Sequence, residues 1–228
     1  MTYDLYIGHK TYSSWSLRSW LMMHKFGLPV REHIVGLYDG TMAQDMAHLA
    51  PARLVPTLQL PDGTIVGESL AIAETLAERH PDAGLWPGDA AARAHARWLV
   101  AEMHAGFGAL RADCPMQLSY HYQGFAASKA VRADLNRIEA LWAMARAAHG
   151  HSGPWLFGAY SLADVFYAPV AMRIAGYGLG VSAPAQAYVQ SHLEDSDITR
   201  WRVEGATEPV TPEPYVLDLP KRPWGLPG

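Results

Sequence analysis

Hydroxyl residues gather directly after the first apolar segment of the chain. Residues 12–18 read YSSWSLR and lie between a predicted strand and a predicted helix. Hydroxyl groups at such a junction stand beside free backbone amides and the positive end of the helix, which together favour a bound anion such as a thiolate. Capping of the helix by Ser13, Ser14 or Ser16 is the structural alternative. Both a thiolate site and a helix cap are consistent with this segment.

A second polar pair, Glu68 and Ser69, stands where a predicted strand ends and a predicted helix begins. Ser69 can cap the helix and also receive a ligand carboxylate, while Glu68 can pair with an ammonium group. The two side chains together suit the two charges of an amino-acid head group. An ordinary helix cap is again the alternative.

The segment 54–57, which reads LVPT, places Pro56 at the start of a predicted strand. Proline is tolerated at the first residue of a strand, so a purely structural role explains this position. A cis bond before Pro56 would expose the backbone of Val55 to a peptide-like ligand. The sequence does not determine the isomer.

Hydrophobic periodicity predicts the elements that hold these residues. The first 80 residues follow the order strand, helix, strand, helix, hairpin, helix. Strands are predicted over 3–7, 31–35, 55–60 and 64–66, and helices over 15–26, 41–49 and 69–80. The Asp-Gly pair at 62–63 is typical of a hairpin turn. This order, βαβαββα, predicts an α/β domain over residues 1–80.

The remainder of the chain predicts helices only. Residues 80–89 are rich in Pro, Gly and Asp and indicate a linker. Helical spacing then covers 90–111, 131–145, 161–174 and 183–193, and Ser161 with Asp164 has the spacing of a helix cap. The acidic run 194–197 is interpreted as a solvated surface, and the proline-rich tail as extended. The fold class is therefore α/β plus all-α, with a helical domain over 90–228.

Composition limits the classes of function. The chain has 228 residues, of which 50% are hydrophobic and 18% charged, with a formal net charge of −4. No basic excess indicates nucleic acid, and no apolar run approaches the ~20 residues of a membrane span. The single cysteine, Cys114, excludes an intrachain disulfide and a CxxC redox pair, so we expect a cytoplasmic protein. His149 and His151 alone make a poor metal site, and no metal is predicted.

Taken together, these segments resemble the cytosolic glutathione transferase superfamily over nearly the whole chain. Four segments carry the resemblance. They match, in order, the serine motif of zeta- and theta-like enzymes, the cis-proline segment, the γ-glutamyl-binding motif and the capping box of the helical domain, and they are residues 13–18, 54–57, 68–72 and 158–164.

The resemblance implies a thioredoxin-like domain followed by an α-helical bundle, usually as a homodimer. Glutathione would be the co-substrate, with its thiol at Ser13 or Ser14, which would stabilise the thiolate rather than deprotonate the thiol. The remaining glutathione contacts would come from Trp15, Arg53, Val55, Pro56, Glu68 and Ser69. A small hydrophobic electrophile would bind in a cleft between the domains, against Trp15, His104, Phe107 and Arg111.

Two departures from the family pattern bear on the activity. Trp15 stands where the zeta class has cysteine, and Arg53-Leu54 precedes the Val-Pro pair where the family often has Lys or Gln. The leading hypothesis is a detoxifying transferase that joins glutathione to the electrophile. The alternatives are a glutathione-dependent isomerase or dehalogenase, and a non-enzymatic binding module with this fold. Trp224, in the tail, would either cover the cleft or dock on the protein's own surface.

Overall fold

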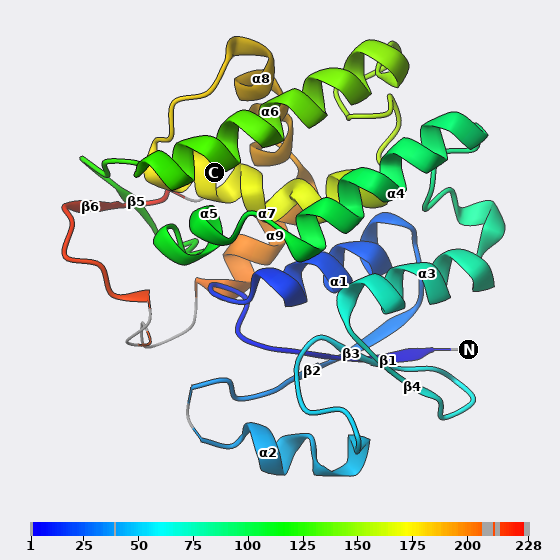
Figure 1. Cartoon of the computed structure of the whole chain (residues 1–228). Helices are drawn as coiled ribbons and strands as arrows, with labels where there is room; N and C mark the ends of the chain where they lie inside the picture. Colours follow the sequence, from blue (N-terminus) through cyan, green and yellow to red (C-terminus); the bar gives the residue numbers. More distant parts are fainter. Residues whose placement is uncertain (1, 39, 207–211, 213–214, 226–228) are drawn as a thin grey trace.

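The first part of the chain forms a four-stranded mixed sheet. The computed structural model describes residues 2–38, 40–206, 212 and 215–225 (Figure 1). The strands are β1 (Tyr3–Ile7), β2 (Val30–Ile34), β3 (Thr57–Gln59) and β4 (Ile65–Gly67), in the spatial order β2-β1-β3-β4. β1 runs parallel to β2 and antiparallel to β3, and β3 runs antiparallel to β4. This is the thioredoxin-like arrangement that the sequence predicted.

The alternation of side chains in β1 assigns the two faces of the sheet. Leu5 and Ile7 belong to the main hydrophobic core, whereas Tyr6 packs in a small second cluster on the opposite face. Helices α1 (Ser14–Lys25) and α3 (Ser69–Arg79) cover the first face, and α2 (Met42–Asp45) with the short 3-10 helix η1 (Ala47–Leu49) lies on the second, as Figure 1 shows. The start of α1 is therefore held between the sheet and the rest of the molecule.

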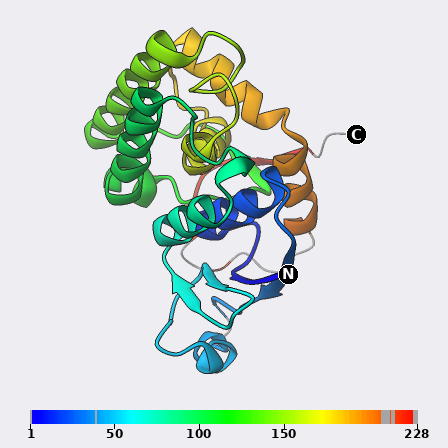
Figure 2. The same ribbon diagram turned by 90° about the vertical axis from the view of Figure 1, so that its right-hand side faces the viewer.

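The rest of the chain is built around one buried helix. After the 3-10 helix η2 (Pro81–Ala83) come α4 (Ala90–Ala105), α5 (Gly108–Asp113), α6 (Lys129–His149), α7 (Leu162–Tyr177), α8 (Ala183–Leu193) and α9 (Ser196–Gly205). All residues of α7 except Ala175 are buried, as expected for a helix that is apolar on every side. Figure 2 looks along this helix, with α4 and α6 on one side and α8 and α9 on the other. α7 also packs against α1.

The helix predicted over 90–111 is in fact two helices. α4 ends at Ala105, and Phe107 adopts a left-handed conformation with φ of 56° before α5 begins. A Cβ at Gly106 would lie 2.7 Å from the Glu102 carbonyl oxygen, so the chain turns at a residue without a side chain. The apolar periodicity continues through this turn and hides it.

Two further predictions for the second part of the chain are wrong, one of them in part. The acidic run is a solvated surface only in part. Glu194 is exposed, but Asp195 is buried, caps α9 by accepting from the N–H groups of Asp197 and Ile198, and pairs with Lys25. The prediction of helices only also fails, since β5 (Tyr120–Tyr122) pairs antiparallel with β6 (Lys221–Pro223). The expected extended tail is thus a strand paired with a segment about 100 residues earlier.

Within the described ranges, no helix is both long enough and apolar enough to cross a membrane.

Candidate functional site

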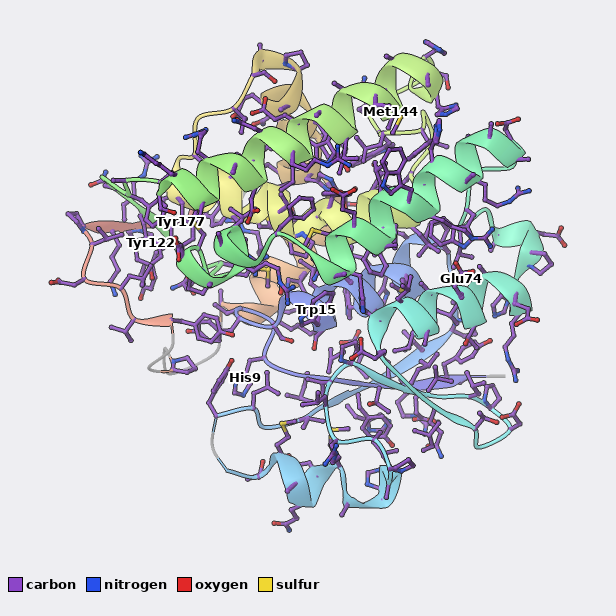
Figure 3. All side chains as sticks on the ribbon, viewed as in Figure 1. His9, Trp15, Glu74, Tyr122, Met144 and Tyr177 are labelled. Carbon is purple, nitrogen blue, oxygen red and sulfur yellow. The ribbon has the colours of Figure 1, made fainter. Side chains whose placement is uncertain are left out.

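Two adjoining cavities lie between the sheet and the helices. The smaller, about 280 Å³, extends towards Glu68 and Ser69, and the larger, about 400 Å³, extends past Ser14. They share four lining residues: Trp15, Leu54, Val55 and Arg111. Figure 3 shows Trp15 between the helices and the sheet, at the level where the two cavities meet. The cavities form one cleft, which we call the central cleft.

Ser13 and Ser14 have different surroundings. Ser13 caps α1: its hydroxyl oxygen accepts from the Ser16 N–H, and its hydroxyl donates to the Ser16 oxygen at 2.7 Å. That oxygen also accepts from the Gly8 N–H. Ser13 is therefore committed to the cap, and only 8% of its surface is exposed.

Ser14 is half-buried and lies at the wall of the larger cavity. Its Oγ accepts a hydrogen bond from Arg173 Nη2 at 3.4 Å. Because that bond uses an oxygen lone pair, the hydroxyl proton of Ser14 is available to a group in the cavity. No acidic residue lies in the first turn of α1, so the positive end of the helix is not neutralised there.

Two arginines flank the indole of Trp15, and a third contacts the neighbouring Ser14. The guanidinium groups of Arg18 and Arg111 lie 4.2 and 4.9 Å from its ring centre, and Arg173 contacts Ser14 beside it. Arg18 is fixed by the carbonyls of Phe166 and Ser14, and its Nη2 is buried with no hydrogen-bond partner.

These three cations have no counter-ion among the residues that the structure describes, where none of them joins an ion pair. Burial and the neighbouring cation Arg111 lower the pKa of Arg173 to about 10, and burial with Arg173 and Arg111 lowers that of Arg18. This wall of the central cleft is consequently electropositive.

The Glu68–Ser69 end of the cleft combines backbone strain with an unsatisfied hydroxyl. Glu68 precedes α3 with φ of 69°, a left-handed conformation that is unusual for a residue with a side chain. Ser69 is 1% exposed and its Oγ has no hydrogen-bond partner, so it does not cap the helix with its side chain. His104 Nε2 lies 3.5 Å from Glu68 Oε2, and His104 Nδ1 is also buried without a partner.

The Val55–Pro56 peptide bond is cis, which the sequence left open. Both residues line the smaller cavity, and Val55 also lines the larger one. The N–H and C=O of Val55 make no hydrogen bond with any other residue in the described ranges. They are free to pair with an extended ligand.

Two residues predicted for the site are not in the central cleft. Arg53 lines a separate cavity of about 640 Å³ beside α2 and η1, and it is not among the residues that line the two cavities of the central cleft. Phe107 is 6% exposed and packs in the main core at the turn between α4 and α5. The other predicted residues line one or both cavities: Ser13, Ser14, Trp15, Val55, Pro56, Glu68, Ser69, His104 and Arg111.

Several residues that line the cleft escaped the sequence analysis, among them Leu37, Tyr38, Arg173 and Tyr215. Arg173 is one of two charged residues in the otherwise apolar α7, and that isolated charge in a buried helix was the available signal. Tyr215 lies in the tail and lines the larger cavity. Trp224 lines neither cavity and packs against Gly176 and His121, so it docks on the protein's own surface.

Cys114 takes no part in the cleft. It is fully buried, and burial raises its pKa to about 12, which keeps it as a thiol. The described residues hold no group of three or more His, Cys, Asp or Glu side chains placed to bind a metal ion.

Comparison with known proteins agrees with this architecture. Residues 12–79 match the family model described as glutathione S-transferase, N-terminal domain. A probable maleylacetoacetate isomerase of Caenorhabditis elegans is 29% identical over 180 residues, covering 78% of this chain and 81% of that protein. A maleylacetoacetate isomerase of Dictyostelium discoideum is 33% identical over 97 residues, 42% of this chain and 44% of its own length.

A solved structure extends the match to the helices. A glutathione transferase homolog from Burkholderia, crystallised with bound glutathione, has a TM-score of 0.67 at 22% identity and covers 90% of this chain and 98% of its own. Residues 12–79 thus match the glutathione S-transferase N-terminal domain model, and the chain as a whole shares its fold with this solved glutathione transferase homolog. The resemblance predicted from the motifs is confirmed.

Proposed function

We propose that this protein is a glutathione transferase that joins the thiolate of glutathione to a small electrophile in the central cleft. The observation that carries the proposal is Ser14, which lines the larger cavity at the positive end of α1 and whose hydroxyl oxygen accepts a hydrogen bond from Arg173. A hydrogen-bond donor beside uncompensated cations is the environment that stabilises a sulfur anion.

Glutathione fits the length of the cleft as an extended peptide. Its γ-glutamyl carboxylate would accept from the unpartnered hydroxyl of Ser69, and its ammonium group would pair with Glu68. The free backbone groups of Val55 would pair with the peptide in the middle. The cysteinyl sulfur would then reach Ser14. A reducing compartment, the cytoplasm in our prediction, would keep that thiol reduced.

The side chains act on the thiol through electrostatics. A free thiol has a pKa near ~8.5, so about 3% of it is thiolate at pH 7. Ser14 is too weak a base to remove the proton, but its hydroxyl donates to the thiolate once formed. Each unit by which the pKa of the thiol falls represents about 1.4 kcal/mol of stabilisation of the anion. The thiolate then attacks the electrophilic carbon, and its electron pair forms the new C–S bond while a leaving group departs or a proton is added.

The direct test is binding followed by turnover. Calorimetry should detect glutathione at or below millimolar concentration, and Ser69→Ala should weaken binding about tenfold, because the buried carboxylate contact is lost. Ser182→Ala is the matched control, since this exposed serine also lies at the start of a helix and makes no side-chain cap hydrogen bond. A panel of electrophiles assayed with and without glutathione then identifies conjugation. No binding of glutathione at millimolar concentration would refute the proposal.

A second candidate function is glutathione-dependent isomerisation, and the electropositive wall favours it. Arg111 and Arg173 line the larger cavity with no carboxylate paired to them in the described ranges, so a negatively charged substrate would be attracted there. The two relatives named as maleylacetoacetate isomerases suggest such an anion for this chain. Product analysis separates the functions, because isomerisation returns glutathione unchanged, conjugation consumes it, and dehalogenation releases halide.

The homodimeric state of the protein is also a proposal. The superfamily resemblance implies a homodimer, and the chain mass is 25.0 kDa. Sedimentation equilibrium should therefore give about twice this mass, and a monomer at micromolar concentration would contradict the prediction.

A further inference from the structure

The tail of the chain returns to the central cleft. Residues 215–225, which we call the C-terminal strap, include β6, paired with β5. Two backbone bonds extend this pairing, from the Gln123 N–H to the Pro220 carbonyl at 2.7 Å and from the Trp224 N–H to the Ser119 carbonyl at 2.8 Å. The strap is thereby fixed to the segment that connects α5 and α6.

Trp224 anchors the far end of the strap on the helical part of the molecule. Its indole is 8% exposed, 4.4 Å between ring centres from His121 and 4.5 Å from the guanidinium group of Arg202. The same guanidinium group donates to the Trp224 and Gly225 carbonyls. A Cβ at Gly176 would approach the indole to 3.2 Å, so the glycine leaves room for the ring.

Tyr215 stands at the other end of the strap and lines the larger cavity. Its hydroxyl is 2.6 Å from that of Tyr38, which follows β2, and its ring centre is 4.7 Å from that of Tyr12. The Tyr122 hydroxyl donates to the Tyr215 carbonyl at 3.1 Å. Tyr215 is therefore held from both parts of the molecule.

We propose that Tyr215 is a specificity-determining residue: its ring forms the outer wall of the subsite for the electrophile, held there by the anchored strap. The inference rests on the proposed function, because it takes the larger cavity as the place where the group attached to sulfur lies. With Tyr12 and Tyr38, Tyr215 gives that place three aromatic side chains. The subsite suits a flat or extended apolar group whose far end reaches Tyr215.

Tyr215 should affect only the group attached to the sulfur, and not glutathione itself. Glutathione itself would lie along Val55 and Ser69, in the smaller cavity, which Tyr215 does not line. A group attached to the sulfur would enter the larger cavity and lose contact with water against the Tyr215 ring. The affinity for an S-substituted glutathione should therefore depend on Tyr215, and the affinity for glutathione should not.

The experiment compares calorimetric binding of glutathione and of S-hexylglutathione to the full chain. Tyr215→Ala should weaken S-hexylglutathione about tenfold and glutathione less than twofold. Tyr215→Phe keeps the ring, loses the bond to Tyr38, and should weaken S-hexylglutathione two- to threefold. Val216→Ala, an exposed neighbour on the strap that lines neither cavity, should change neither ligand.

Trp224→Ala tests whether the strap holds the wall. Trp224 is remote from the cleft, so a selective loss of S-hexylglutathione binding in this variant, with a native circular dichroism spectrum, would follow from release of the strap. If Tyr215→Ala binds both ligands as the wild type does, or loses both equally, the inference is wrong. If the wild type binds neither ligand, the proposed function itself fails, which is a different outcome.

Discussion

Helices α1 and α7 both have a serine at the N-cap, but the surroundings of the two helix starts differ. Ser161 precedes α7 and Ser13 precedes α1, each with its hydroxyl oxygen bound to a backbone N–H of the first turn. The sequence around them is similar in kind, since a small polar residue follows a loop and precedes an apolar helix. The difference lies in what occupies the space in front of each helix.

The start of α7 is closed. The Asp164 carboxylate accepts from the N–H groups of Leu156 and Ser161, from the Ser161 hydroxyl and from the Tyr188 hydroxyl. Burial raises the pKa of Asp164 to about 6, against these hydrogen bonds, which lower it. The Asp164 carboxylate and the groups that donate to it are paired inside the protein, so this cap stabilises the fold.

The start of α1 is open. Its first turn has no acidic residue, and Ser13 completes the cap while Ser14 faces a cavity bounded by arginines. A helix end whose positive charge is left uncompensated beside a cavity is a place for a ligand anion. Two features therefore distinguish this binding site from a structural cap. Ser14, next to the N-cap, lines a cavity, and the first turn of α1 has no acidic residue.

The largest expected effect is a loss of stability when the Asp164 carboxylate at the start of α7 is removed. Asp164→Ala leaves two backbone N–H groups and the Tyr188 hydroxyl buried without an acceptor, which should lower the free energy of unfolding by at least about 3 kcal/mol. Urea denaturation measures this loss. The glutathione affinity of the molecules that remain folded should be unchanged. A stability within 1 kcal/mol of wild type would show that α7 does not depend on this network.

The next largest expected effect is a loss of turnover when the Ser14 hydroxyl at the start of α1 is removed. Ser14→Ala removes the donor to the thiolate and should reduce kcat about a hundredfold, as loss of one preorganised donor does elsewhere. The melting temperature should stay within about 2 °C, because Ser14 takes no part in the cap. Turnover with several electrophiles, together with the pH dependence of thiolate absorbance, measures the effect. Unchanged turnover would assign the thiol to another donor.

The comparison also separates what sequence can predict from what it cannot. Ser14, Val55 and Ser69 each lie in a short segment whose neighbours define a junction between elements, so local patterns located them. Arg173 and Tyr215 lie 159 and 201 positions after Ser14, and reach it because α7 packs on α1 and the strap pairs with β5. Nothing in their immediate sequence specifies that packing.

The errors in the helical part have a physical origin of the same kind. Apolar spacing records which face of a segment is buried, and it continues unbroken through the turn at Gly106 and Phe107. The charge of Asp195 likewise led to the wrong prediction that it is solvated, because its partner Lys25 lies on a helix 170 positions earlier. Burial of a charge depends on that partner, and the partner is assigned by the fold.

The third prediction concerns a histidine near the start of α7 and its contribution to the stability of the fold at acid pH. His192 is fully buried beside Tyr188, both ring nitrogens lack partners, and burial followed by the charge of Lys25 lowers its pKa to about 3. The unfolded chain binds a proton at ~6.5, so the stability that neutral His192 contributes is present above pH 6.5 and is lost as the pH falls towards 3.

Replacing His192 should therefore make the free energy of unfolding depend less on pH. Between pH 7 and pH 5 the wild type should lose about 2 kcal/mol more than His192→Phe, because one proton per molecule is taken up on unfolding over about 1.5 pH units. Asp164 contributes with the opposite sign, but it is common to both proteins and cancels in the difference. His151→Phe, at an exposed histidine, is the control. Parallel pH profiles for wild type and His192→Phe would contradict the prediction.

The smallest effect should come from the cap serine of the open end. Ser13→Ala removes the acceptor for the Ser16 N–H and should cost about 1 kcal/mol of stability, the usual value for an N-cap. Its hydroxyl proton is bound to Ser16, so turnover at saturating glutathione should fall less than threefold. Measured beside Ser14→Ala, this variant assigns the cap and the thiolate contact to two adjacent serines. A reversed pattern, with turnover lost in Ser13→Ala and kept in Ser14→Ala, would mean that the helix start rearranges when glutathione binds and that Ser13 leaves the cap to reach the sulfur.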